Sequence, residues 1–180
     1  MKDKNALQTI KINLDAQPLP AGLYLVGTPI GYLKDISLRA LETLMSVDVV
    51  ACEDTRVTGK LLHYYGIEAK KIKYNDHSDA RAREEIFRRI GEGQAVALCS
   101  DAGLPLIADP GYKLVSECVD RGVYVTSIPG ANAALTGLQL SGFTTDQFAF
   151  LGFLPSKAKA REDYLLQFKT LSMTQVYYET

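Results

Sequence analysis

The sequence has 180 residues, of which 47% are hydrophobic and 23% charged, the balance of a soluble globular protein with one large domain, or one domain and part of a second. A formal net charge of −1 gives no overall basic field, which weakens a nucleic-acid-binding role but leaves room for a local basic patch. The apolar runs are too short to cross a bilayer, and the N-terminus lacks the apolar core of a secretory signal. These features predict a cytoplasmic protein with no membrane association.

Residues 1–20 are polar, end in a segment with Pro18 and Pro20, and predict a flexible leader. After them, strand-like runs alternate with helical segments. Strands are expected at 23–27, 47–52, 71–75, 95–99 and 123–128, and helices lie between them. Asp35 is expected to cap the first helix, whose apolar positions are Leu38, Leu41, Leu44 and Met45. A further helix is expected around Leu114, Val115 and Val119, and another within 129–142.

Strands separated by helices of about ten to fifteen residues predict parallel pairing with right-handed crossovers. Apolar runs such as 95–99 fit strands that helices cover on both faces. We therefore expect residues 21–145 to form one α/β domain with a doubly wound, mostly parallel sheet. The segment 146–180 has a strand, an amphipathic helix and a second strand pattern, and is interpreted as the start of a second, truncated α/β domain.

The cysteines, Cys52, Cys99 and Cys118, are widely spaced and have no histidines nearby to complete a zinc site. Cys52 and Cys99 end apolar strand-like runs, which favours reduced structural thiols. The two histidines, His63 and His77, have no triad or metal partners in the sequence pattern. We therefore expect no metal site.

Four loops of unusual composition follow predicted strands: 27–31, 53–56, 100–111 and 129–134. Glycines there let the backbone approach a ligand, and prolines fix the loop. Taken singly, each loop is an ordinary turn: Asp101 and Asp109 can cap the next helix, and Glu53 and Arg56 can form a surface ion pair. Because ligands bind at the carboxyl ends of parallel strands, we expect the loops to converge on one edge and enclose one cavity.

Nucleotide-binding and hydrolase motifs are missing from these loops. The loop "GTPIG" lacks the third glycine of the dinucleotide fingerprint, and the chain contains neither a phosphate-binding P-loop nor a G-x-S-x-G elbow.

At these loops the sequence resembles the ribosomal RNA small subunit methyltransferase I family, a branch of the tetrapyrrole methylase superfamily, or class III methyltransferases. The resemblance is carried by "LYLVGTPIGYLKDISLRALETLMSVDVVACEDTRVTGKLL", "SDAGLPLIADPG", "IPGANAALTGLQLSGF" and "FLGFLP". It runs in order from about Gly22 to the last residue. The sequence departs from the family where Tyr32 replaces an asparagine, Leu104 a threonine and Ala108 a serine. The family also continues past the point that matches "VYYET", into most of a second domain.

The resemblance implies methyl transfer from S-adenosylmethionine to the ribose 2′-hydroxyl of a cytidine in 16S rRNA, within the small ribosomal subunit. It also implies a two-domain fold, with the cofactor in the cleft between the domains, and a homodimer. The cofactor-binding residues that it implies are Pro29 and Gly31 in the first loop, Ser100, Asp101, Ala102, Gly103 and Pro105 in the third, and Pro129, Gly130 and Ala131 in the last.

A ribose hydroxyl is a poor nucleophile at neutral pH, so a general base is expected to help. Asp101 is the first candidate, with Glu53 and Asp54 as alternatives; these acids can equally bind the cofactor or orient loops. Arg56 and Lys60 are candidate RNA-phosphate contacts. Lys157, Lys159 and Arg161 extend this stripe or belong to a solvated helix face.

Two other functions fit the same sequence. One is a methylase of small tetrapyrrole precursors, as in the wider superfamily. The other is a non-catalytic remnant that binds RNA or a protein partner through the α/β domain.

Overall fold

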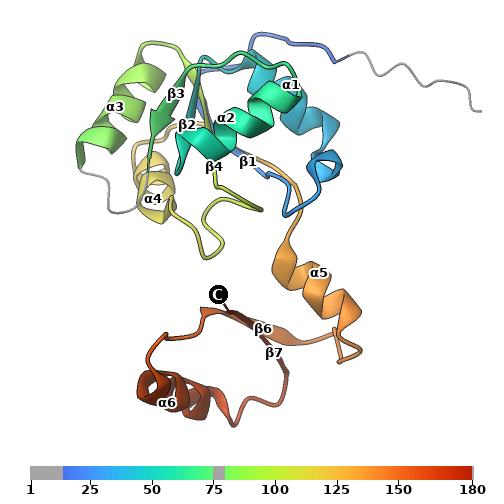
Figure 1. Ribbon diagram of the computed structural model, residues 1–180. Helices are drawn as coiled ribbons and strands as arrows, with labels where there is room; N and C mark the ends of the chain where they lie inside the picture. The colour runs from blue at the N-terminus through green and yellow to red at the C-terminus, as the bar shows by residue number, and fades with distance from the viewer. Residues whose placement is uncertain (1–13, 75–79, 180) are drawn as a thin grey trace, which may run out of the picture.

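The chain folds into two separate sheets in the computed structural model, which describes residues 14–74 and 80–179 (Figure 1). The larger sheet contains β1 (Gly22–Val26), β2 (Val49–Cys52), β3 (Lys71–Lys73), β4 (Ala95–Cys99) and β5 (Val125–Ile128). All of its strand pairs are parallel, and the strand order is β3-β2-β4-β1-β5. The predicted parallel α/β fold is therefore confirmed.

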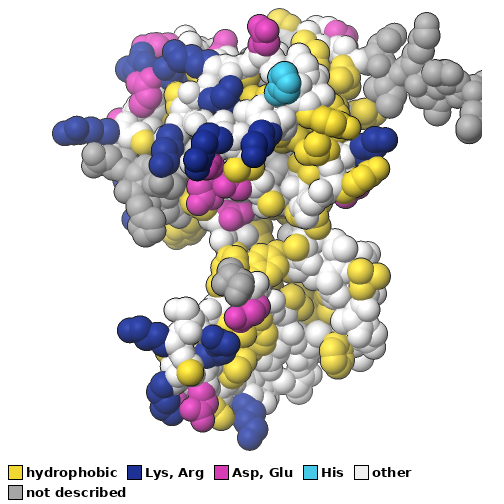
Figure 2. Space-filling view, viewed as in Figure 1, with side chains coloured by type: hydrophobic (Ala, Val, Ile, Leu, Met, Phe, Trp, Pro, Cys, Tyr) yellow, Lys and Arg dark blue, Asp and Glu magenta, His cyan; other side chains and the backbone are white. Residues whose placement is uncertain are grey.

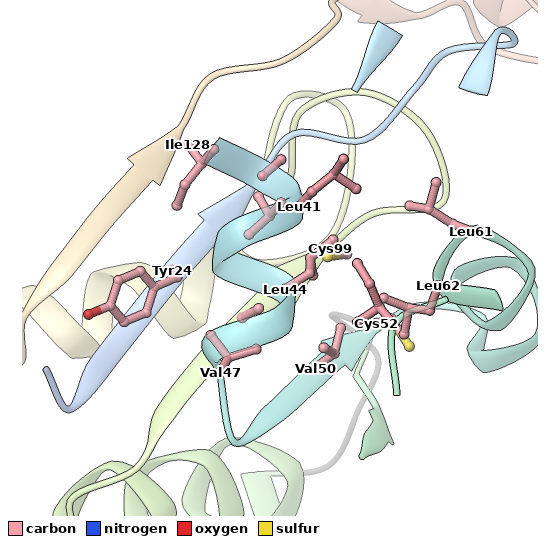
Figure 3. Packing of buried hydrophobic residues seen from close by; sticks show 14 of the residues in the cluster. Tyr24, Leu41, Leu44, Val47, Val50, Cys52, Leu61, Leu62, Cys99 and Ile128 are labelled. Atoms are coloured by element: carbon pink, nitrogen blue, oxygen red, sulfur yellow. The ribbon is translucent and has the colours of Figure 1, made fainter. Parts of the chain in front are cut away.

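Helices cover both faces of this sheet. The helices between its strands are α1 (Leu38–Ser46), α2 (Thr55–Tyr64), α3 (Ala80–Gly91) and α4 (Tyr112–Asp120), with a short 3₁₀ turn, η1 (Leu33–Asp35), before α1. Along β1, Tyr24 and Val26 pack with residues of α1 and α2, whereas Leu23 and Leu25 pack with residues of α3 and α4 (Figure 3 shows the first cluster). Both faces are apolar because both are covered, as the continuous hydrophobic strand runs indicate.

The strand order places a topological switch between β1 and β4. These two strands are hydrogen-bonded neighbours, yet β1 leads through α1 to β2 on one side, and β4 leads through α4 to β5 on the other. The connections after β1 and β4 therefore lead to opposite sides of the sheet, and the carboxyl ends of strands at such a switch point are the usual ligand position in open α/β sheets.

The loops after β1 and β5 meet without side chains between them. A Cβ atom built on Gly27 would lie 2.7 Å from the Cα of Gly130, and one built on Gly130 would lie 2.8 Å from the Cα of Gly27. The Gly27 N–H also donates a hydrogen bond to the Ile128 carbonyl at 3.0 Å. Glycine is required at both positions because the two backbones are in contact.

The first helix differs from the sequence-based expectation at its start. Asp35 ends the 3₁₀ turn, and Ser37 is the N-cap, with its side chain accepting a hydrogen bond from the Ala40 N–H at 3.1 Å. Leu41 and Leu44 are buried as expected, but Leu38 and Met45 are 49% and 39% exposed. The predicted cap at Asp35 is therefore wrong, because the extra turn places the start of α1 two residues later.

Smaller differences occur elsewhere. In α4, Leu114 is buried as expected but Val119 is 70% exposed, and Cys118 takes the second core position. Cys52, Cys99 and Cys118 are all buried free thiols. Residues 1–13 of the expected leader lie outside the described residues, and Leu14 and Leu19 pack against the core. Within the described ranges, no helix has the length and apolar character needed to span a membrane.

The second sheet pairs β6 (Phe148–Phe153) with β7 (Thr174–Tyr178) in parallel, with α6 (Ala158–Phe168) between them in sequence. The Tyr178 ring packs edge-on against Phe150 and Phe153, at centroid distances of 4.8 and 5.3 Å. Helix α5 (Ala133–Leu140) links the two sheets and contacts β7 (Figure 1). The division into units 21–145 and 146–180 stays a prediction.

Substitution of the capping residue tests the start of α1. Ser37→Ala is expected to lower the free energy of unfolding by about 1 kcal/mol, because the Ala40 N–H loses its acceptor. Asp35→Ala is the matched control and is expected to change it by less than about 0.5 kcal/mol. Urea denaturation followed by circular dichroism measures both, and an equal or larger loss in Asp35→Ala would contradict the assignment.

Paired glycine substitutions test the contact between the β1 and β5 loops. Gly130→Ala is expected to lower the free energy of unfolding by about 1–3 kcal/mol, because its methyl group overlaps the Gly27 backbone. Gly137→Ala, in the exposed interior of α5 with nothing within 4 Å, is expected to stabilise by up to about 1 kcal/mol. If both variants unfold at the same urea concentration, the loops do not touch as described.

Candidate functional site

The four loops singled out in the sequence gather at the carboxyl edge of the larger sheet. We refer to them by the strand that they follow: the β1 loop (27–31), the β2 loop (53–54), the β4 loop (100–111) and the β5 loop (129–132). The expectation that they share one edge is confirmed. Backbone contacts join the β1 loop to the β4 and β5 loops, and a bond from a backbone N–H to the Asp101 side chain joins the β2 loop to the β4 loop.

The β1 and β4 loops form a short antiparallel bridge across the switch point. The Thr28 N–H donates to the Gly103 carbonyl at 2.8 Å, and the Gly103 N–H donates back to the Thr28 carbonyl at 3.2 Å. The Thr28 hydroxyl, which is buried, donates to the Ser100 carbonyl at 3.3 Å. These bonds hold the two loops at a fixed separation.

The β4 loop contains two non-glycine residues in the left-handed region, Leu106 at φ 71° and Ala108 at φ 59°. Such conformations cost free energy and persist only where the surroundings impose them. Gly111, at φ 133°, closes the loop, and a Cβ there would lie 2.8 Å from Leu106 Cδ1 and 2.9 Å from Leu98 Cδ2. The proline-rich and glycine-rich composition therefore produces a tightly constrained loop rather than a mobile one.

One cavity, of about 350 Å³, lies between the two sheets and is called the main cavity because residues near both sheets line it. Its lining comes from the β1 and β4 loops, the start of α5 and the ends of β6 and β7. Its apolar lining includes Ile30, Leu104, Ile107, Phe153 and Tyr178, and its polar lining includes Asp101, Asp109 and Asn132. Tyr178 also joins β7 to α5, because its hydroxyl accepts a hydrogen bond from the Ala134 N–H at 3.2 Å.

Two further hollows adjoin the main cavity. A hollow of about 300 Å³ between the β1 loop and α2 is lined by Pro29, Gly31, Lys60 and Ser100 among others. A more polar hollow of about 450 Å³ lies at the β2 loop and is lined by Glu53, Asp54, Thr55, Arg56, Lys73 and Asp101. Asp101 borders all three spaces and is their common point.

The structure separates the sequence-predicted cofactor residues into groups. Asp101, Ala102 and Gly103 line the main cavity, whereas Pro29, Gly31 and Ser100 line the hollow beside α2. The remaining ones, Pro105, Pro129, Gly130 and Ala131, line none of these three spaces. Gly130 instead contacts the Gly27 backbone and so holds the β1 and β5 loops together.

Sequence reasoning missed several residues that line the main cavity. Asn132 had a usable signal, because it is the last residue of the β5 loop and caps α5 by accepting a hydrogen bond from the Leu135 N–H at 2.9 Å. Phe153 and Tyr178 had none, because they come from the second sheet and their position depends on how it packs.

Asp54 is engaged by α2 and its arginine. One of its carboxylate oxygens accepts a hydrogen bond from the Arg56 N–H at 2.8 Å, and the other forms an ion pair with the Arg56 guanidinium at 2.6 Å. These hydrogen bonds hold the pKa of the Asp54 carboxyl well below its usual range. The surface ion pair considered between Glu53 and Arg56 is therefore replaced by one between Asp54 and Arg56.

Asp101 connects two of the loops. Its Oδ1 accepts a hydrogen bond from the Asp54 N–H at 3.1 Å, which fastens the β2 loop to the β4 loop. The N-cap residue of α4 is Gly111, so neither Asp101 nor Asp109 occupies the capping position.

Glu53 and Asp109 have raised pKa values for a shared reason. Partial burial is the main cause for both, and neighbouring carboxylates raise the pKa of Glu53 further: Asp101 first, then Asp109 and Asp54. For Asp109, a hydrogen bond from Ser100 opposes the rise.

Within the described part of the chain, no three His, Cys, Asp or Glu side chains converge as metal ligands would.

The sequence is similar to curated proteins named ribosomal RNA small subunit methyltransferase I. It is 48% identical to the one from Mesorhizobium japonicum over 93% of this chain and 57% of that protein, and 47% identical to the one from Escherichia coli O157:H7 over 88% of this chain and 55% of that protein. The chain thus spans little more than half the length of these relatives. The resemblance inferred from the loop motifs is confirmed.

Solved structures support the fold. A diphthine synthase superposes with a TM-score of 0.65 at 18% identity, covering 88% of this chain and 64% of that one. The uroporphyrin-III C-methyltransferase from Thermus thermophilus superposes with a TM-score of 0.56 at 21% identity, covering 74% of this chain and 60% of that one. Residues 22–179 also match the family described as Tetrapyrrole (Corrin/Porphyrin) Methylases, and the chain belongs to that family.

Proposed function

We propose that this chain carries the cofactor-binding part of an S-adenosylmethionine-dependent methyltransferase that acts on the ribose 2′-hydroxyl of a cytidine in 16S rRNA. The observation that carries the proposal is the main cavity, into which the β1 loop, the β4 loop, α5 and β7 all contribute residues. The relatives that share these loops are named for small-subunit rRNA methylation. The proposal includes a cytoplasmic homodimer, as the resemblance implies.

The residues present suit S-adenosylmethionine. The cavity volume of about 350 Å³ is within the range of small-ligand sites, and Ile30, Leu104 and Ile107 offer an apolar wall for a purine face. Asp101 and Asp109 favour a ligand that carries positive charge. When bound, the cofactor supplies an electrophilic methyl group on a sulfonium.

The other predicted cofactor residues have assigned roles in this proposal. Ala102 and Gly103 present backbone to the cofactor, and Pro29, Gly31 and Ser100 shape the adjoining hollow. Pro105, Pro129, Gly130 and Ala131 act indirectly, by fixing the loops that carry the cavity wall.

Among the three candidate acids, the contacts favour Glu53 as the base that accepts the ribose hydroxyl proton. Asp54 is a weak base because its pKa is lowered and its oxygens are bonded to Arg56. Asp101 already accepts the Asp54 N–H and so orients the loops. Glu53 lies in the adjoining hollow, and its raised pKa brings its basicity nearer the working pH. This order reverses the sequence-based preference for Asp101.

Arg56 and Lys60 remain the proposed RNA contacts of the sequence analysis. Lys60 borders the hollow beside α2, whereas the Arg56 guanidinium is held by Asp54 and must leave that ion pair to reach a phosphate. Lys60 is accordingly the stronger candidate for an RNA-phosphate contact.

Calorimetric titration tests the cofactor assignment directly. S-adenosylmethionine is expected to bind a chain extended to the length of the curated relatives, and titration of the 180-residue chain shows how much of the site it contains. Methyl transfer to small ribosomal subunits, with no transfer to a porphyrinogen, is the expected specificity. Transfer to the porphyrinogen alone would favour the tetrapyrrole alternative, and an extended chain that binds no cofactor would leave the non-catalytic remnant.

Substitution in the same extended chain separates the acids. Glu53→Gln is expected to lower kcat by about 10²–10⁴-fold with little change in cofactor affinity, because only the proton acceptor is lost. Asp101→Asn keeps an oxygen that can accept the Asp54 N–H and is expected to keep most of the activity. A larger loss in Asp101→Asn than in Glu53→Gln would return the role of base to Asp101.

The stability of the chain is expected to depend on pH through Glu53. A carboxyl whose pKa is raised by folding binds more protons in the folded state, so its contribution to stability is complete in acid and is lost as pH rises through the folded-state pKa. Glu53→Gln should therefore raise the free energy of unfolding at neutral pH, and the gain should vanish below the ordinary pKa of glutamate. The exposed Glu68→Gln is the control, and identical pH profiles for both variants would refute the shift.

A further inference from the structure

Exposed lysines form a strip across α2 and β3, beside the candidate site. The lysine strip consists of Lys60 from α2, and Lys71 and Lys73 within β3. Figure 2 shows basic side chains in a row across this face of the molecule, with a group of acidic side chains directly below them. The β3 residues were interpreted in the sequence only as a short strand.

The sheet register places β3 lysines and α2 on the same face. Lys71 pairs in register with Val50, and Lys73 with Cys52, and both of those side chains pack in the cluster that contains α2 residues. Residues two apart on a strand point to the same side. Accordingly, the Lys71 Cε lies 3.7 Å from a Cβ built on Gly59 of α2, so the lysine stem lies over the helix.

The strip borders the hollows next to Asp101. Lys60 lines the hollow beside the β1 loop, and Lys73 lines the hollow that contains Glu53. A polymer that follows the strip therefore passes both hollows.

The lysines of the strip are available for an external anion. Within residues 14–74 and 80–179, none of the three forms an ion pair. Some other basic residues on the surface are engaged: Arg88 pairs with Glu85, and Lys159 pairs with Glu162 and Asp163. Arg161 donates to the Pro155 and Ser156 carbonyls. Lys159 and Arg161, which were expected to extend the basic stripe, therefore already have partners within the protein.

We propose that the lysine strip binds the sugar–phosphate backbone of the RNA acceptor and leads one strand across the hollow that contains Glu53. The inference rests on the proposed RNA methyltransferase function and adds Lys71 and Lys73 to its contacts. Lysine ammoniums attract phosphates as point charges and fix the position of a strand without reading its sequence.

A competing explanation is that lysines on an edge strand prevent sheet-to-sheet aggregation. β3 is the last strand of the sheet, and charged edge residues commonly serve this purpose. That explanation accounts for Lys71 and Lys73 but not for Lys60, which lies on α2 and borders a hollow.

A double substitution with a charge-matched control tests the proposal. Lys71→Gln/Lys73→Gln removes two charges from the strip, one of them beside the hollow that contains Glu53, and leaves Lys60 unchanged. Lys113→Gln/Lys169→Gln removes two exposed charges elsewhere, from α4 on the opposite face of the sheet and from the residue after α6. Binding of a labelled short RNA hairpin is measured by fluorescence anisotropy across a series of salt concentrations.

The strip double variant is expected to bind RNA about tenfold more weakly at low salt, and the slope of log affinity against log salt should fall by about 2. The control should match the unaltered chain. An unchanged slope, an equal loss in the control, or equally effective competition by polyglutamate would overturn the proposal. Retained RNA binding with new self-association in the strip variant would assign the lysines to edge protection and would also overturn it.

Cofactor titration of the same variants keeps this inference separate from the proposed function. The strip variant is expected to bind S-adenosylmethionine as the unaltered chain does, since neither substituted lysine lines the main cavity. An unaltered extended chain that binds RNA but no cofactor would contradict the methyltransferase proposal and leave the strip in place.

Discussion

Backbone contact between Gly27 and Gly130 is the constraint on which the site depends. With no room for a Cβ at either position, the β1 and β5 loops are held together at main-chain level. The β4 loop joins the same group through the Thr28–Gly103 bridge. The larger sheet contributes residues to the main cavity through these three loops. Contacts between the loop backbones therefore fix the positions of those residues. A cavity built in this way loses little conformational entropy when a ligand enters it.

The acidic residues beside this framework divide into different tasks because of their partners. Asp54 forms an ion pair with Arg56 and caps α2, and one Asp101 oxygen accepts a hydrogen bond from the Asp54 N–H. Partial burial and then three acidic neighbours raise the pKa of Glu53, and the charge of Lys73 opposes this rise less than either of them favours it. Repulsion among neighbouring carboxylates raises their pKa values, and the rise is largest for the carboxylate with the fewest stabilising hydrogen bonds or cations. This distribution of contacts makes Glu53, rather than Asp101, the group best suited to hold a proton transiently.

The sequence predicted the elements well because each carried its own period, and it predicted the loops because glycine and proline collect where a buried strand ends. It failed where two local signals competed. Asp35 and Ser37 are both good capping residues, and only the 3₁₀ turn at Leu33–Asp35 decides between them. The pairing of Arg56 with Asp54 depends on cap geometry, which spacing does not encode. Phe153 and Tyr178 line the main cavity because the second sheet packs next to the loops of the larger sheet. That contact is long-range, and no motif in the loops of the larger sheet predicts it.

The near-zero net charge of the chain conceals a local separation of charge that matters for the proposed substrate. The lysine strip lies next to the acidic group, and Lys73 and Glu53 line the same hollow. The charge of Lys73 also acts to lower the pKa of Glu53. In the proposed function, an RNA phosphate would be attracted to the strip and repelled by the carboxylates, which favours a strand with its phosphates along the lysines and a ribose toward Glu53. Whole-chain charge counts against nucleic acid, but the arrangement of that charge is what such a substrate requires.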